Sequence, residues 1–113
     1  MNALNIRNGK QLADNVTVAD NLFSRMKGLL GKRDMMSGEA LWIKPCMSVH
    51  TCLMKFSIDV LFLSRRNHVI AAITNLQPNR MTRLYLKSAS VLELPAGVLE
   101  TTDTRVGDEI EIS

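Results

Sequence analysis

Short apolar runs dominate this chain, and polar residues or Asn, Gly, Pro and Ser separate them. Runs of this length, bounded by turn-forming residues, predict strands rather than helices. The expected strands cover residues 41–43, 58–63, 69–74 and 91–94, with a short edge strand at 84–86 and a half-exposed strand at 109–112. Asn8-Gly9 predicts a hairpin within residues 4–16, because this pair tolerates the two positive φ angles of a type I′ turn.

Residues 17–31 show the one clear helical pattern in the chain. Thr17 with Asp20 three residues later resembles a capping box, and apolar residues then recur at helical spacing as far as Leu30. Gly31 suits the left-handed end of such a helix. About seven short strands and one amphipathic helix (about 18–31) therefore predict a mainly β (α+β) fold, a compact β-sandwich or small barrel with the helix packed against it.

The length of 113 residues, of which 46% are hydrophobic, predicts one domain spanning 1–113. The 14 basic and 11 acidic residues are interleaved, which favours a solvated surface over a nucleic-acid-binding face. The N-terminus has no signal-peptide core, and no apolar run approaches the roughly 20 residues that span a bilayer. We therefore expect a cytoplasmic protein with no membrane contact and with both cysteines as thiols.

Most residues suited to chemistry lie in 41–63, which holds the only Trp, both cysteines, one of the two histidines and two of the three Phe residues. Cys46, His50 and Cys52 form a Cys-x3-His-x-Cys pattern, but zinc sites normally add a second ligand pair, which this sequence lacks. A catalytic thiol needs a hydrogen-bonded His and a group that orients it, and no known cysteine-hydrolase pattern surrounds either cysteine. We expect structural thiols here, with no metal and no cofactor.

Asp59 and Glu93 each interrupt an apolar strand, and an ionised carboxylate out of water is costly unless it is paired or hydrogen-bonded. Arg25, on the helix with the apolar stripe, and His50 are natural partners for them. If these side chains converge, they form a partly buried polar site, and the candidate ligand-binding residues are Arg25, His50, Thr51, Asp59 and Glu93. The alternative is structural: the two acids face solvent, or they accept backbone N–H bonds that fasten loops.

Four blocks of residues together follow the pattern of one protein family. They are Phe23-x-Arg25-x-x-Gly28-Leu29, then Ser48-Val49-His50-Thr51-x-x-Met54-x-Phe56-x-Ile58-Asp59-Val60-x-Phe62, then Leu92-Glu93-Leu94-Pro95-Ala96-Gly97, and last Gly107-Asp108. In this order they resemble DUF192 (UPF0127), a bacterial and archaeal domain of unknown function, over about residues 18–112. The resemblance implies a compact, mainly β domain and no assigned activity. Cys52 stands where the family often has an aromatic residue, so the resemblance gives this thiol no catalytic role.

Three functional hypotheses follow from these observations. The favoured one is a small binding or accessory module, whose polar pocket near residues 45–59 accepts a small polar ligand or a protein segment. The alternative is a small hydrolase that uses His50 with Asp59 or Glu93 as acid and base groups. The third is weak nucleic-acid binding through dispersed basic residues. We favour binding over catalysis because no complete set of nucleophile, base and orienting group is visible in the sequence.

Overall fold

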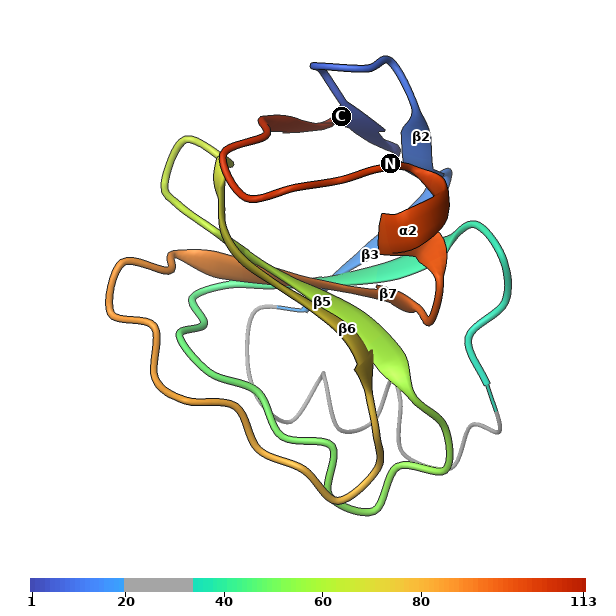
Figure 1. The fold of residues 1–113 in the computed structure, drawn as a ribbon, viewed down its shortest axis with the longest axis vertical. Coiled ribbons are helices and arrows are strands. Elements are labelled where there is room, and N and C mark those ends of the chain that lie inside the picture. The colour runs from blue at the N-terminus through green and yellow to red at the C-terminus, as the bar shows by residue number, and fades with distance from the viewer. Residues whose placement is uncertain (20–33) are drawn as a thin grey trace.

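A computed structural model describes residues 1–19 and 34–113 of this chain, which form eight strands and one short helix (Figure 1). The elements are β1 (Ala3–Asn5), β2 (Gln11–Ala13), β3 (Asn15–Ala19), β4 (Glu39–Ile43), β5 (Ile58–Leu63), β6 (Val69–Leu76), β7 (Ser90–Pro95), α2 (Val98–Thr101) and β8 (Ile110–Ile112). One sheet has the strand order β3-β4-β7-β5-β6, and the other has the order β2-β1-β8. Among the described strands, β3 and β4 pair in parallel and the remaining pairs are antiparallel.

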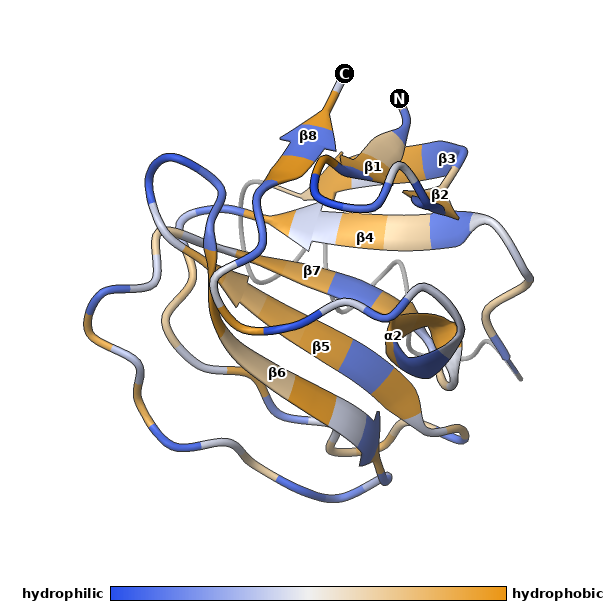
Figure 2. Ribbon diagram, turned by 45° about the horizontal axis from the view of Figure 1, so that its top comes forward, coloured by the Kyte–Doolittle hydropathy of each residue, from blue (hydrophilic) through white to orange (hydrophobic). Residues whose placement is uncertain are grey.

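The five-stranded sheet is the middle layer of the fold, and both of its faces are covered. Successive residues of β5 alternate between the faces: Leu61 packs towards the small sheet and α2, and Phe62 packs towards two long loops, 45–57 and 77–89. We call these the cover loops. Figure 2 shows β5 and β7 as apolar over most of their length, with a hydrophilic band in each. The sheet therefore separates two apolar cores.

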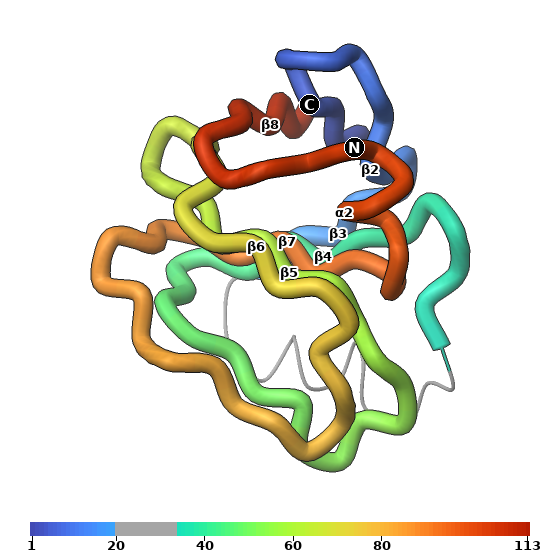
Figure 3. Tube along the Cα trace, in the orientation of Figure 1, coloured from blue at the N-terminus to red at the C-terminus, as the bar shows by residue number. Residues whose placement is uncertain are grey.

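The cover loops run side by side along the second face of the sheet (Figure 3). The backbone N–H of Thr82 donates to the carbonyl of Val49 at 2.9 Å, and that of Tyr85 donates to the carbonyl of Met47 at 2.8 Å. The ring of Tyr85 packs on Phe62 of β5, with 4.3 Å between the centroids. The loops are thus bonded to each other and anchored in the core.

The mainly β prediction is confirmed, and the described strands form two sheets rather than a closed barrel. β5 has the predicted bounds, and β4, β6, β7 and β8 overlap the strands expected at 41–43, 69–74, 91–94 and 109–112. These runs were visible because each is apolar or alternating and ends at a turn-forming residue. Within the described part of the chain, no helix has the length and hydrophobicity needed to cross a bilayer.

β1 and β2 form the hairpin that Asn8-Gly9 predicts, but the turn type differs. The N–H of Asn5 donates to the carbonyl of Lys10 at 2.9 Å, which encloses the four-residue loop 6–9. Gly9 has φ +72°, whereas Asn8 is not among the residues with positive φ. The type I′ prediction is therefore wrong, because the longer loop needs only one left-handed residue, which glycine adopts without strain.

The predicted start of the helix is wrong. Thr17, Val18 and Ala19 belong to β3, which pairs in parallel with β4 and places Thr17 opposite Leu41. β-branched residues favour a strand once a partner strand is available, and a local capping pattern takes no account of that partner. The remainder of the predicted helix, residues 20–31, lies outside the described residues.

The edge strand expected at 84–86 is also wrong. These residues lie in the second cover loop, where Leu84 and Leu86 are exposed and Tyr85 is half-buried. The backbone here bonds to the other cover loop instead of a sheet edge. A short alternating run carries the same signal in both situations, so the sequence did not distinguish them.

Candidate functional site

Asp59, in the middle of an apolar strand, is completely buried and serves as a backbone anchor. Its Oδ1 accepts the N–H of Asn75 at 2.9 Å, and its Oδ2 accepts the N–H groups of Gly97 and Leu99, both at 3.0 Å. Asn75 has φ +53° near the end of β6, and Gly97 has φ +100° at the start of α2. The carboxylate therefore fastens two irregular points of the backbone, which matches the structural alternative raised by the sequence.

Glu93 is also completely buried, but it faces the other side of the sheet. It lies opposite Val60 in the register of β7 and β5, and Val60 packs in the core beneath the cover loops. Asp59 lies opposite Leu94, which packs in the core beneath α2. Because residues directly opposite each other share a face, the two carboxylates point away from each other. The structure does not bring them to one site.

His50 and Thr51 lie in the first cover loop, on the same side of the sheet as Glu93. His50 is half-buried and forms a β-bridge with Met81 of the second cover loop. Thr51 is completely buried, and its hydroxyl donates to the carbonyl of Gln77 and accepts the N–H of Arg80 at 2.9 Å. Thr51 thus joins the two cover loops. Arg25, the fifth candidate, lies outside the described residues.

Thr51→Val is expected to lower the free energy of unfolding by about 2 kcal/mol, because it leaves a partly buried carbonyl and a partly buried N–H without their hydroxyl partner. Thr51→Ser keeps the hydroxyl and is the matched control, with an expected loss below about 1 kcal/mol. Urea unfolding followed by circular dichroism measures both. Equal stabilities for the two variants would show that the hydroxyl does not hold the loops together.

The cysteines give no sign of a shared site. Cys46 is half-buried, with its Sγ 3.0 Å from the carbonyl oxygen of Ser48, whereas Cys52 is exposed. Cys52 is a free thiol. Within residues 1–19 and 34–113, no group of three His, Cys, Asp or Glu side chains is placed to hold a metal ion.

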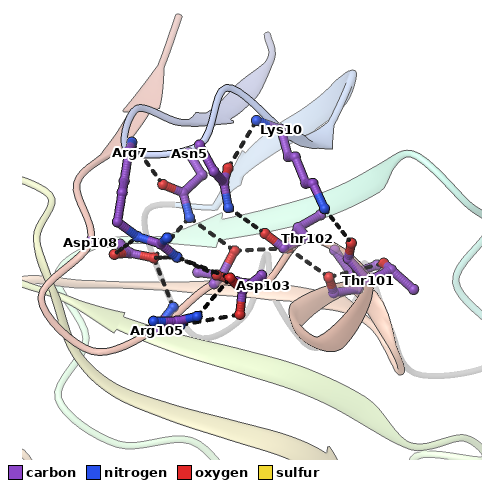
Figure 4. A network of polar contacts seen from close by, with 11 residues as sticks. Asn5, Arg7, Lys10, Thr101, Thr102, Asp103, Arg105 and Asp108 are labelled. Carbon is purple, nitrogen blue, oxygen red and sulfur yellow. Dashed lines mark hydrogen bonds and ion pairs between the residues drawn. The ribbon is translucent and has the colours of Figure 1, made fainter.

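A second polar cluster joins the β1–β2 hairpin to the segment between α2 and β8 (Figure 4). Buried Asp108 is its centre and accepts bonds from Arg7 Nε at 2.7 Å, Asn5 Nδ2 at 2.9 Å and the N–H of Arg105 at 2.8 Å. The guanidinium of Arg7, helped by Asn5 and the Arg105 N–H, holds the pKa of Asp108 well below its usual range, against the opposing effect of burial. This cluster ties distant parts of the chain together.

A grooved part of the described surface lies next to the turn between β5 and β6. The N–H of Ser64 donates to the carbonyl of His68 at 2.9 Å, and the N–H of Asn67 donates back to the carbonyl of Ser64 at 2.9 Å. Asn67 has φ +61°, as a three-residue hairpin loop requires at its third position. This geometry leaves Arg65 and Arg66 exposed at the tip of the turn.

Two adjoining grooves lie between this turn and the second cover loop. The first has a volume of about 630 Å³ and is lined by Ser64, Arg65, Arg66, His68, Leu86, Lys87, Ser88 and Ala89. The second has a volume of about 290 Å³ and is lined by Ile70, Arg83, Leu84, Tyr85, Leu86 and Lys87. The grooves share Leu86 and Lys87 and therefore form one continuous surface, which we call the basic groove.

The charge of the basic groove is concentrated in one segment of the chain. Residues 60–92 contain five Arg or Lys and no Asp or Glu, whereas the rest of the chain has nine basic and eleven acidic residues. These five residues are Arg65, Arg66, Arg80, Arg83 and Lys87, of which all but Arg80 line the basic groove. None of the five forms an ion pair with a described residue. One acid lies close to the groove lining: the Oε1 of Glu109 lies 3.6 Å from Nε2 of His68.

The sequence interpretation missed this surface because it weighed the balance of charges over the whole chain. The signal that would have found it is the run of 33 residues without an acid, from Val60 to Leu92. Such a run marks a positive patch only if its exposed cations gather in space, and here two separate segments bring them together.

Comparison with known proteins agrees with the mainly β domain. A family profile described as "Uncharacterized ACR", which defines DUF192, matches residues 3–112. The chain belongs to this family. Among its relatives, the UPF0127 protein of Pyrococcus furiosus is 30% identical over 113 residues, covering 96% of this chain and 95% of that protein. A UPF0127 protein of Pyrococcus horikoshii is 30% identical over 101 residues, covering 85% of each chain.

Two solved bacterial structures share the DUF192 fold. One is a Sinorhizobium meliloti protein labelled provisionally as a transcription regulator, with a TM-score of 0.79 and 21% identity over 97% of this chain and 89% of that one. The other is a Novosphingobium aromaticivorans protein of unknown function, with a TM-score of 0.76 and 17% identity over 99% of this chain and 93% of that one. At these identities the likeness shows the fold.

The structure also explains residues of three DUF192-like sequence blocks. Asp59 of one block accepts the N–H of Gly97 of another, so these blocks form one structural unit. Asp108, from the last block, is the centre of the polar cluster that holds the hairpin. These residues therefore have structural roles that require no ligand.

Proposed function

We propose that this chain is a binding module whose ligand carries anionic groups, and that the basic groove holds them. The observation that supports this proposal is the groove lining: Arg65, Arg66, His68 and Lys87 surround about 630 Å³ without an acidic lining residue. Such a volume lies within the range of about 300–1,000 Å³ that is typical of ligand sites. Guanidinium groups suit carboxylates and phosphates because their N–H donors match two oxygens at once.

The serines of the groove support its shape rather than its charge. The Oγ of Ser64 accepts the N–H of His68 at 3.1 Å, which closes the hairpin turn. The Oγ of buried Ser88 lies 2.8 Å from the carbonyl oxygen of Cys46 and 3.0 Å from that of Ser90. Both hydroxyls are engaged in hydrogen bonds that hold the hairpin turn and the second cover loop in place. Recognition of the ligand is therefore left to the cations of the lining.

The proposal keeps the binding role expected from the sequence but moves the ligand away from residues 45–59. That loop supports the groove, because Met47 accepts the N–H of Tyr85 and Cys46 accepts the hydroxyl of Ser88. A hydrolase that pairs His50 with Asp59 is less well supported, because the carboxylate of Asp59 already accepts three backbone N–H groups. Glu93 lies on the same side of the sheet as His50, so the structure does not separate that second pair.

Arg65→Ser with Arg66→Ser is expected to weaken the binding of small anions at least tenfold, because each lost charged hydrogen bond contributes about 1.5–3 kcal/mol. The probes are inorganic phosphate and glutarate, titrated at low salt into ¹⁵N-labelled protein. In the wild-type protein, the amide signals expected to move belong to Ser64–His68 and Leu86–Ala89.

The matched control removes the same charge elsewhere, by Lys10→Ser with Lys55→Ser, two exposed lysines outside the groove lining. This control is expected to keep the wild-type affinity within about twofold. If both double variants lose binding equally, the effect is net charge and the proposed site is wrong. If neither anion moves any groove signal, the proposed function is wrong.

A further inference from the structure

We infer that the natural ligand of the basic groove is an acidic peptide segment of a partner protein with apolar side chains between its carboxylates. This inference rests on the proposed function and specifies the class of ligand. It comes from the second cover loop, where Met81, Leu84 and Leu86 lie between basic residues at positions 80, 83 and 87. A partner with the opposite charge and matching apolar positions complements this surface.

Three large apolar side chains of this loop are exposed. Met81 is 76% exposed, Leu84 is 52% exposed and Leu86 is 76% exposed. They lie between the cations Arg80, Arg83 and Lys87 along the chain, as the printed sequence shows. A free anion such as phosphate gains nothing from these side chains, whereas a peptide that carries Leu or Phe buries them.

The exposed positions of these apolar side chains are set by the backbone hydrogen bonds of the loop. Hydrogen bonds from Thr82 to Val49 and from Tyr85 to Met47 fix the loop against its neighbour. Tyr85 turns inward onto Phe62, while the residues on either side of it point outward. A pre-formed surface of this kind binds a peptide without first paying the entropy of ordering its own loop.

The second part of the groove provides room for an apolar anchor. Its volume is about 290 Å³, and Ile70, Leu84 and Leu86 contribute to its lining. A cavity of about 150 Å³ already accommodates a benzene molecule, so one side chain of the size of Leu or Phe fits here. Lys87 and Arg83 line the same space and can pair with carboxylates on both sides of that anchor.

Single-stranded nucleic acid is the competing polyanion, and the aromatic residue of this surface argues against it. Binding of single strands relies on exposed aromatic rings on which bases stack. Tyr85 is the aromatic residue of the groove lining, and its ring is stacked on Phe62 and covered by the guanidinium of Arg83, 4.9 Å from the centroid. These two contacts compete with a base for the ring, whereas the exposed Leu and Met side chains suit a peptide.

The test compares two fluorescein-labelled peptides of equal length and charge, one alternating Glu with Leu and the other alternating Glu with Ser. Fluorescence anisotropy at low salt measures the dissociation constants. The Glu-Leu peptide is expected to bind at least tenfold more tightly, because it buries at least one Leu side chain. Leu84→Ser with Leu86→Ser is expected to abolish this difference and leave the Glu-Ser peptide unchanged.

The matched control is Val18→Ser with Met36→Ser, which changes two exposed apolar residues outside the basic groove. Val18 lies in β3, the strand at the opposite edge of the sheet from β6, and Met36 precedes β4 in the chain. This variant is expected to keep the full preference for the Glu-Leu peptide. Arg65→Ser with Arg66→Ser is expected to weaken the binding of both peptides, which would show that they bind in the basic groove.

The outcomes separate this inference from the proposed function. If the two peptides bind equally, and both still need Arg65 and Arg66, the inference that the partner peptide carries apolar side chains is wrong, but the anion site remains. Absence of binding by either peptide and by phosphate overturns both. Tighter binding of a single-stranded oligonucleotide than of the Glu-Leu peptide, with the same dependence on Arg65 and Arg66, assigns the groove to nucleic acid and also overturns the inference.

Discussion

Asp59→Ala is expected to lower the free energy of unfolding by about 3–5 kcal/mol, the largest effect of any single change considered for this chain. The substitution leaves the N–H groups of Asn75, Gly97 and Leu99 without their acceptor in a buried environment. It also removes the contact that fixes the start of α2 relative to β5. For a domain of this length, the melting temperature should fall by roughly 12–20 °C.

Asp59→Asn tests whether the stability depends on the two oxygen acceptors of the side chain or only on its shape. Asn keeps one carbonyl oxygen but places an amide NH₂ group against at least one of the backbone N–H donors, so about half of the loss is expected. Glu100→Gln, an exposed acid on α2, is the control and should change stability by less than about 0.5 kcal/mol. Wild-type stability in both Asp59 variants, measured by guanidinium unfolding, would show that this carboxylate does not fasten the backbone.

The second large effect is expected at Asp108. Asp108→Asn should lower the free energy of unfolding by about 2–3 kcal/mol at pH 7, because the charge-assisted bonds from Arg7 and from the N–H of Arg105 are lost or weakened. Melting curves at pH 7 measure the loss directly. The exposed acid Glu111 on β8 provides the control, and Glu111→Gln should have almost no effect.

Asp108 also makes the stability depend on pH in a defined direction. Its pKa in the folded protein lies well below the value of 3.8 for an isolated Asp, so folding favours the ionised form. The stabilisation is complete above about pH 5 and is lost as the pH falls through the unfolded pKa towards the folded one. The wild-type protein should therefore lose stability steeply below about pH 4, and Asp108→Asn should lose less over the same range. Parallel pH profiles for the two proteins would contradict this role.

The strands were the most predictable part of this fold. β5 is a run of apolar residues with one acid, enclosed by Ser57 and Ser64, and its bounds follow from this local pattern. The Asn8-Gly9 pair located the first hairpin, although the loop is longer than the pair alone suggests. The capping pattern at Thr17 failed because the segment finds a parallel partner in β4, which no local pattern records.

The candidate site was predictable only in part, because the two acids were singled out as interruptions of apolar strands, but neither their burial nor the face of the sheet that each takes was decided. In the register between β5 and β7, Asp59 lies opposite Leu94 and Val60 lies opposite Glu93. A shift of one residue would pair Asp59 with Glu93 and place both carboxylates on the same face. Whether these acids converge therefore depends on the register between β5 and β7, and no local sequence pattern specifies that register.

By itself, the sequence determined the family, the mainly β class, the positions of five strands and the presence of two acids within apolar strands, because each depends on residue type and short-range periodicity. The tertiary structure decided which face each acid takes and which loops lie together. It also brought Arg65 and Arg66 of a hairpin turn beside Lys87 of a loop about twenty residues away, around one groove. Such a surface exists only after strand pairing fixes the ends of both segments, since charge acts through distance in space and not along the chain.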